Sequence, residues 1–157
     1  MSVFKLLSIF IVSATLLSSC KKTSSTPVAV PPTVQYVSAS TTGAFAGTLY
    51  ATIGYLSASW DNSGMHPILH IAASNIAGSL KGSSINFVIN QYPFTTGTFP
   101  INDTTVTAQY IHFPTGGGYA TQGSLTITSI TPYITSTFSF RCTDLTIVTG
   151  SLNVLAP

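Results

Sequence analysis

Apolar and polar residues alternate one for one through much of this chain, and the segment Ile134–Cys142 is the clearest case. Its apolar face carries Ile134, Phe138, Phe140 and Cys142, and its polar face carries Thr135, Thr137, Ser139 and Arg141. A period of two residues is typical of a β-strand with one buried face, whereas a helix repeats every 3.6 residues. The fold therefore has to bury one side of its strands.

The same alternation recurs between residues 33 and 157, with β-branched residues in the runs and Gly, Asn or Asp between them. We expect about eight strands and no significant helix; the predicted strands are Phe45–Ile53, Tyr55–Trp60, Met65–Ala73, Ser84–Asn90, Thr104–Phe113, Ser124–Ile130, Ile134–Cys142 and Leu145–Val154. The short connections favour antiparallel neighbours. We predict an all-β domain, a single antiparallel meander packed as a sandwich or as a partly closed barrel.

Glycines mark two points where the alternation changes phase. The apolar residues expected to face inward change phase from Leu49 and Ile53 before Gly54 to Leu56 after it. They change again from Leu145 and Ile147 before Gly150 to Leu152 and Val154 after it. A pattern that flips needs a bulge or a turn, so we expect one at each glycine. The run from Gly116 to Gly118 lacks the lysine and the following helix of a phosphate-binding loop, and is predicted to be a mobile hairpin loop.

Charge is scarce in residues 33–157. The cations are Lys81 and Arg141, the anions are Asp61, Asp103 and Asp144, and glutamate is absent, so the formal charge is 2 − 3 = −1. About a quarter of the residues of an average protein are charged. With no basic face to neutralise phosphates, a nucleic-acid partner is not expected. Serine and threonine hydroxyls take the place of charge at the surface.

Near the N-terminus lies an apolar run of 12 residues, Leu6 to Leu17, which ends in Leu17-Ser18-Ser19-Cys20. The run is too short for a membrane span, which needs about 20 residues, and suits a signal peptide. A small residue before a cysteine resembles the lipobox of bacterial lipoproteins. We predict a signal peptide over residues 1–19 and lipidation of Cys20. An ordinary secretory signal with an incidental cysteine, or a retained anchor, are the alternatives.

Residues 20–32 follow as a lipidated cysteine and a tether rich in serine, threonine and proline. Proline favours an extended chain of about 3.1 Å per residue, so the segment could hold the domain away from the lipid surface. A disordered leader with no spacing role is the alternative.

Four short segments of the second half form a recognisable set: Gly97-Thr98-Phe99, Gly123-Ser124-Leu125-Thr126-Ile127-Thr128, Ile134-Thr135-Ser136-Thr137-Phe138-Ser139-Phe140 and Val148-Thr149-Gly150-Ser151-Leu152-Asn153-Val154. Together they resemble the C-terminal half of an uncharacterised family of small Bacteroidota lipoproteins. The resemblance covers roughly residues 85–154 and departs from the family at Ser136, at Leu152 and at Cys142 beyond the strand. It implies an all-β lipoprotein and brings no catalytic residues.

Residues that could carry catalysis do not assemble into a recognisable site. His66 and His70 lie four residues apart, about 13 Å along a strand, which is too far for one metal ion, and nothing in the alternation brings His112 to them. The sequence lacks the Gly-x-Ser-x-Gly motif that exposes a nucleophilic serine on a sharp turn. We therefore expect no catalytic residues, no metal and no cofactor. A small hydrolase is the less favoured alternative.

Aromatic residues could instead form a binding platform. Trp60, Tyr50 and Tyr55 are candidate glycan contacts, because sugar rings stack on aromatic faces while their hydroxyls meet serine, threonine and asparagine. Cross-strand packing of the tyrosines is the alternative. Asp103-Thr104-Thr105 resembles the short acceptor motif for protein O-glycosylation in Bacteroidota, with Thr104 as the acceptor.

Cys142 is the one cysteine left after Cys20. The alternation puts it on the face of Phe138 and Phe140, so we predict a buried thiol with a raised pKa. A reactive thiol activated by a histidine is the alternative.

These observations predict a non-enzymatic lipoprotein of the cell envelope that acts as a binding or structural module. The expected location is the outer membrane, where the lipid anchor is the membrane partner. Lys21-Lys22 lacks the acidic residues that resemble a surface-export signal, which favours the periplasmic face and leaves the cell surface open. A glycan or another envelope protein is the expected further partner, and a glycan-binding module using exposed aromatic residues is the alternative function.

Overall fold

The computed structural model describes residues 34–157, apart from residues 53, 75–77, 103 and 113–115. The described residues contain no helix and ten strands, and every pairing between these strands is antiparallel. The strands are β1 (Tyr36–Thr42), β2 (Gly47–Thr52), β3 (Leu56–Asp61), β4 (Ile68–Ser74), β5 (Ser83–Ile89), β6 (Gly97–Pro100), β7 (Val106–His112), β8 (Gly116–Ser129), β9 (Tyr133–Cys142) and β10 (Ile147–Leu155). The predicted all-β meander is confirmed. None of the described residues belongs to a helix able to span a membrane.

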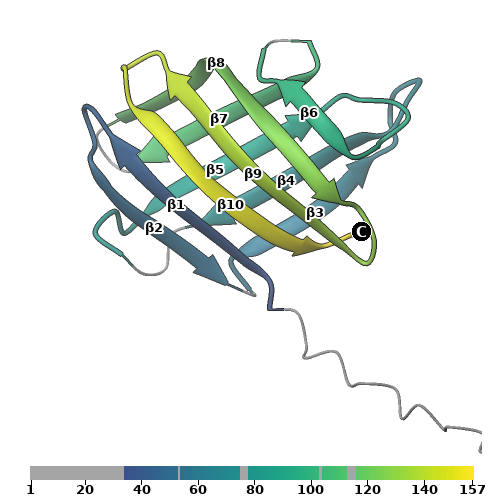
Figure 1. The fold of residues 1–157 in the computed structure, drawn as a ribbon, viewed down its shortest axis with the longest axis horizontal. Coiled ribbons are helices and arrows are strands. Elements are labelled where there is room, and N and C mark those ends of the chain that lie inside the picture. Colours follow the sequence, from purple (N-terminus) through teal and green to yellow (C-terminus); the bar gives the residue numbers. More distant parts are fainter. Residues whose placement is uncertain (1–33, 53, 75–77, 103, 113–115) are drawn as a thin grey trace, which may run out of the picture. The chain divides into compact units, whose positions relative to one another are not determined.

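The strands form one sheet that curls into a nearly closed barrel (Figure 1). The strand order is β2-β1-β10-β9-β8-β7-β5-β4-β3, and β6 adds to β8. β2 and β3 are neighbours in the chain, so the ends of the order are brought together by a turn at Gly54, whose φ is +94°. The predicted turn at Gly54 is thus confirmed. The edge of β2 is covered, because Thr48 exchanges hydrogen bonds with Ser79 Oγ and the Leu80 amide.

Strand β8 is the corner that divides the curled sheet into two layers. Its first residues pair with β7, and the rest pair with β9 and β6. We call the layer of β2, β1, β10, β9, β6 and the second part of β8 sheet A, and the layer of β3, β4, β5 and β7 sheet B. The strands of the two layers cross each other in Figure 1. A register shift between Ala120 and Gln122 makes the bend, as bulges do at the corners of curled sheets.

The two layers bury a core built from the alternate residues of their strands. Phe87 of β5 in sheet B meets Phe138 and Phe140 of β9 in sheet A, with ring centroids 5.0 and 5.9 Å apart. Aromatic pairs at these distances stabilise beyond the area they bury. The interior is therefore filled by side chains where the two layers face each other.

Three expectations from the sequence need correction. β1 and β6 were missed, because β1 reads mostly as Ser, Thr and Ala and β6 has only four residues. Gly116–Gly118 are not a loop: they open β8, where a Cβ on Gly117 would lie 2.3 Å from the Tyr110 carbonyl oxygen. The glycines permit this close strand approach.

No bulge or turn occurs at Gly150, which pairs in regular register with both β1 and β9. The predicted phase change was wrong because Leu145 and Ile147 are 60% and 43% exposed and never faced the core. Glycine is required there for space, since a Cβ would lie 2.8 Å from Cζ of Phe138. The Phe138 ring occupies the inner side of the strand at this point.

Cys142 lies on the core side of β9, as predicted, and is 1% exposed. Burial is the main cause that raises the pKa of its thiol from 9.0 to about 11, with a smaller contribution from the charge of Asp144. A protonated thiol without solvent access is a poor nucleophile.

We predict that Cys142 resists a small aromatic disulfide reagent at neutral pH in the native protein. The same thiol should react stoichiometrically in denaturant, because unfolding exposes it and lowers its pKa. Absorbance of the released thiolate measures both rates. Rapid native labelling would show that this end of β9 opens readily and would contradict the burial of Cys142.

The same pKa shift predicts a dependence of stability on pH. Below about pH 9 the thiol is protonated in both states; above it the unfolded state loses the proton first, so the free energy of unfolding falls as pH rises from about 9 toward 11. Urea unfolding of the protein and of Cys142→Ala at several pH values tests this. The alanine variant should show a shallower fall over this range, and parallel curves would contradict the shift.

Candidate functional site

An aromatic pocket lies between the β3–β4 and β5–β6 connections. Its volume is about 340 Å³, and it is lined by Trp60, Asn62, Pro67, Gln91, Tyr92 and Phe94. We call it the aromatic pocket. Trp60 reaches it from the inward phase of β3, the phase of Leu56 and Ala58, at the end of the strand where the core opens.

Ring contacts hold the pocket in shape. Phe94 packs edge-on against Trp60, with centroids 5.6 Å apart. Tyr92 is 61% exposed and stacks on His66, with centroids 4.7 Å apart and planes 12° from parallel. The β3–β4 connection is tied by Asp61, which accepts a hydrogen bond from the Ser63 amide; hydrogen bonds from Ser63 hold the pKa of this carboxyl below its usual value.

The lining suits a small uncharged ligand with both apolar and polar faces. Small-molecule sites are typically concave, mostly apolar, and carry a few polar groups that fix orientation. Here aromatic rings supply the apolar surface, and the side-chain amides of Asn62 and Gln91 supply donors and acceptors. None of the six lining residues is charged, so the pocket gives no Coulombic attraction to an ion.

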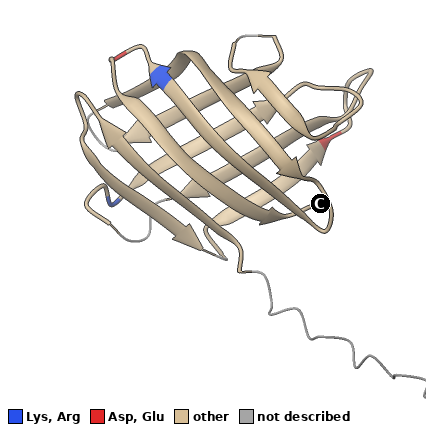
Figure 2. Ribbon diagram, viewed as in Figure 1, with Lys and Arg blue, Asp and Glu red and all other residues tan. Residues whose placement is uncertain are grey.

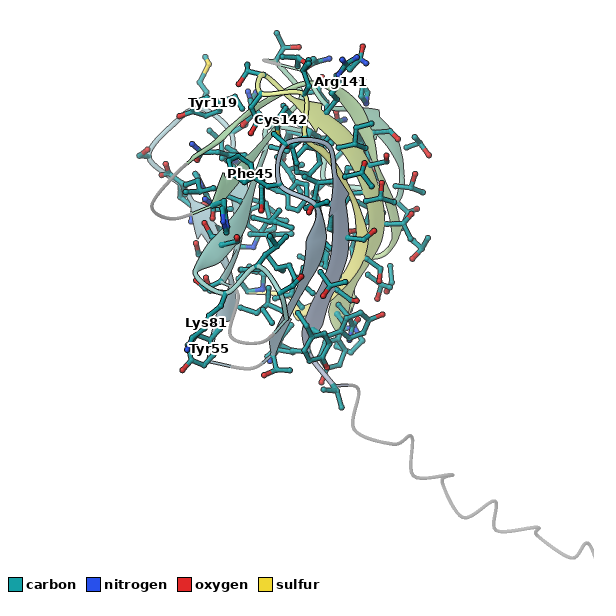
Figure 3. The ribbon with its side chains drawn as sticks, turned by 90° about the vertical axis from the view of Figure 1, so that its left-hand side faces the viewer. Phe45, Tyr55, Lys81, Tyr119, Arg141 and Cys142 are labelled. Atoms are coloured by element: carbon teal, nitrogen blue, oxygen red, sulfur yellow. The ribbon has the colours of Figure 1, made fainter. Side chains whose placement is uncertain are left out.

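The three predicted glycan contacts are not brought together. Trp60 lines the aromatic pocket, Tyr50 lies on the outer face of sheet A, and Tyr55 is 54% exposed in the turn after β2. Figure 3 shows Tyr55 at the end of the domain opposite Arg141 and Cys142. Tyr92 and Phe94 were missed as partners of Trp60. The available signal was the aromatic cluster Tyr92-Pro93-Phe94 in the connection after a predicted strand.

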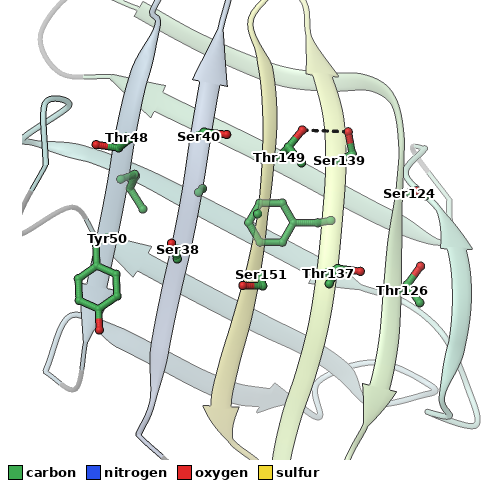
Figure 4. A pocket seen from close by; sticks show the side chains of 14 residues that line it. Ser38, Ser40, Thr48, Tyr50, Ser124, Thr126, Thr137, Ser139, Thr149 and Ser151 are labelled. Carbon is green, nitrogen blue, oxygen red and sulfur yellow. Dashed lines mark hydrogen bonds between the residues drawn. The ribbon is translucent and has the colours of Figure 1, made fainter.

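A second, larger concave surface lies on the outer side of sheet A (Figure 4). It is an open hollow of about 720 Å³. Ten hydroxyl-bearing residues line it, two from each of five strands: Ser38, Ser40, Thr48, Tyr50, Ser124, Thr126, Thr137, Ser139, Thr149 and Ser151. We call this surface the hydroxyl face.

No charged side chain that the structure describes lines the hydroxyl face, and the nearest cation along β9 is Arg141, the next outward residue after Ser139. Among the described residues, Lys81 and Asp144 lie in connections, Asp61 ends β3, and Arg141 is next to the last residue of β9. Figure 2 accordingly shows the charges at the ends of the strands. None of the residues that line the hydroxyl face is Asp, Glu, Lys, Arg or His.

A serine and a histidine meet at the end of the domain near β8, as a hydrolase would require. Ser83 Oγ lies 2.7 Å from Nδ1 of His112 and 3.3 Å from the Tyr110 hydroxyl. Ser83, however, is 1% exposed, and Phe45 packs on the His112 ring with centroids 5.0 Å apart. The buried Tyr110 hydroxyl has a pKa raised mainly by burial. A substrate therefore has no access to Ser83 Oγ. The hydrogen bonds among Ser83, His112 and Tyr110 instead satisfy polar groups that the fold buries.

The remaining sequence candidates lie apart from both surfaces. His70 lies on β4 and His66 precedes that strand, and the described residues contain no group of three or more His, Cys, Asp or Glu placed to hold a metal ion. Thr104 is exposed in the β6–β7 connection, where its amide and hydroxyl donate to Oδ1 of Asn102. Its glycosylation stays a prediction. Cys20 and the tether lie outside the described residues.

Comparison with known proteins gives no relative on which to base a function: no family model, curated protein or solved structure matches this chain. The resemblance to small Bacteroidota lipoproteins stays a prediction from the sequence.

Proposed function

We propose that this protein is a non-enzymatic glycan-binding module of the bacterial cell envelope, held on the outer membrane by lipid on Cys20 and facing the periplasm. The observation that carries the proposal is the aromatic pocket, in which Trp60, Tyr92 and Phe94 surround a space of about 340 Å³ beside two side-chain amides. That volume is within the range of about 300–1,000 Å³ usual for small-ligand sites.

The chemistry of the pocket favours a neutral sugar over other ligands of this size. A pyranose ring has an apolar face of C–H groups that packs on an aromatic ring and a rim of hydroxyls that both donate and accept hydrogen bonds. Asn62 and Gln91 offer both functions in one side chain. An anionic ligand would find no cation among the lining residues, and a purely apolar ligand would leave the amides without partners.

An enzymatic role has weaker support. The nearest pairing to a catalytic one is Ser83 with His112, in which Ser83 is buried and the half-buried His112 ring packs against Phe45. Neither lines the aromatic pocket or the hydroxyl face. We therefore favour binding over hydrolysis, with the sugar recognised and released unchanged.

Trp60 is the chain's one tryptophan, so its fluorescence reports on the pocket directly. We predict that neutral oligosaccharides shift the Trp60 emission in a saturable way. Tyr92→Ala should weaken binding by about tenfold or more, because truncating an exposed aromatic contact costs on the order of 1–2 kcal/mol. Tyr55→Ala removes a tyrosine of similar exposure elsewhere on the domain, and this variant should bind as the parent does.

Two results would contradict the proposal. One is an emission spectrum unchanged by every neutral oligosaccharide in a broad panel. The other is equal weakening by Tyr92→Ala and Tyr55→Ala, which would mean that the pocket is not the site. Circular dichroism of each variant checks that the β-structure is retained.

The anchor is tested separately. We predict that the parent protein partitions into the detergent phase, because each buried methylene of an acyl chain contributes about 0.8 kcal/mol. Cys20→Ala removes the acylated sulfur and should move the protein to the aqueous phase. If the alanine variant still partitions into detergent, lipidation of Cys20 is wrong, whatever the pocket binds.

A further inference from the structure

The hydroxyl face is a regular array because its residues stand in register across the strands. One row is Thr48, Ser40, Thr149, Ser139 and Ser124, and the next is Tyr50, Ser38, Ser151, Thr137 and Thr126. Thr98 of β6 continues the second row through its partner Thr126, which lies 3.0 Å away between hydroxyl oxygens. Each row therefore crosses five strands without a charged or aliphatic side chain.

The spacing of the array follows from the sheet. Adjacent strands lie about 4.8 Å apart, and alternate residues along a strand lie about 6.8 Å apart, so each row offers a hydroxyl roughly every 4.8 Å over about 19 Å. Most of these hydroxyls are free for a ligand. In the described part of the chain, side-chain hydrogen bonds engage only the pair Ser139–Thr149, 3.2 Å apart, and Thr126.

The array is a property of sheet A and not of the whole surface. On the outer side of sheet B the corresponding row runs Ser59, His70, Val88 and Thr107, and its neighbour runs Ser57, Ala72, Asn86 and Gln109. Aliphatic, imidazole and amide side chains interrupt both rows. A general scarcity of charge would affect both sheets alike, so it does not account for the unbroken hydroxyl rows of sheet A.

We propose that the hydroxyl face is a second binding surface, which takes an extended, uncharged polysaccharide chain. Three features favour this occupant. The hollow is open and about 720 Å³, so it suits a chain that continues past the site at both ends. The lining has no charge to attract an ionic polymer. Each hydroxyl both donates and accepts, so the rows can exchange hydrogen bonds with the hydroxyls that such a polymer repeats along its length.

The proposal rests on the proposed function for its ligand class, but it concerns a different surface and a different length of ligand. The aromatic pocket holds one end or one short unit of a sugar, whereas the hydroxyl face requires a polymer. Hydrogen bonds between protein hydroxyls and a neutral ligand are also nearly insensitive to salt, unlike contacts between exposed charges. Length dependence and salt independence therefore distinguish this surface from an ionic one.

Co-sedimentation and affinity electrophoresis of the full-length protein in mild detergent test the proposal. The probes are cellulose, dextran and mannan as neutral polymers, and alginate and heparin as charged ones. We expect retention by at least one neutral polymer, equal at about 0.05 M and about 0.5 M NaCl, and none by the charged polymers. Retention only by charged polymers, or by no neutral polymer, would overturn the proposal.

Matched variants locate the binding. The combined change Ser38→Ala, Ser40→Ala and Thr137→Val removes three hydroxyls from the face and keeps β-compatible side chains. It should weaken polymer binding tenfold or more. The control Ser57→Ala, Ser59→Ala and Thr107→Val removes the same groups from sheet B and should bind as the parent does. Equal effects of both triples would overturn the proposal.

The outcomes also separate the two sites. If the sheet A triple loses the polymer but keeps the Trp60 response to short sugars, both proposals stand. If it keeps the polymer while Tyr92→Ala loses it, the aromatic pocket is the whole site and the proposal for the hydroxyl face fails. A face used between copies of this chain would appear in sedimentation velocity as a dimer that the sheet A triple abolishes, and that result would also overturn the proposal.

Discussion

Burial of one side of a continuous antiparallel sheet is the constraint on which the rest of this structure depends. Each strand contributes alternate residues to a shared interior, and the bend in β8 brings the apolar sides of sheets A and B together. Phe87 from one layer then closes on Phe138 and Phe140 from the other. With so few charges to pair, this burial and the strand hydrogen bonds carry the stability of the domain.

Side chains fill the interior between the two layers and leave no room for a ligand there. The two layers pack on each other, so recognition is left to the ends of strands and to the outer faces. The aromatic pocket forms where Trp60 continues the inward phase of β3 past the packed core and meets the β5–β6 connection. The hydroxyl face forms because the same alternation that buries Phe138 turns Thr137 and Ser139 outward. Both surfaces therefore follow from the alternation of inward and outward side chains along the strands.

The prediction from the sequence was correct where apolar and polar residues alternate without a break. It failed where strands are short or polar and where exposed aliphatic residues imitate a buried face. Ile134–Cys142 was assigned correctly, to within one residue, down to the buried thiol of Cys142. Gly150 was misread because Leu145 and Ile147 were assumed to be buried, whereas Leu145 lies exposed in the turn after β9 and Ile147 points outward at the start of β10. The hydroxyl rows could not be foreseen, since they depend on the register of five strands. Trp60 was identified, but Phe94 and Tyr92, which line the same pocket, come from a connection distant in the sequence.

Amide chemical-shift mapping with a bound neutral oligosaccharide tests whether the domain recognises neutral sugars on its outer surface, as we propose. We expect shifts that cluster around Trp60 and Tyr92 and that extend along β1, β9 and β10 when a longer chain is used. Shifts around Ser83 and His112, with turnover of the sugar, would contradict the proposal in favour of an enzyme. An unchanged spectrum at saturating sugar would contradict it outright.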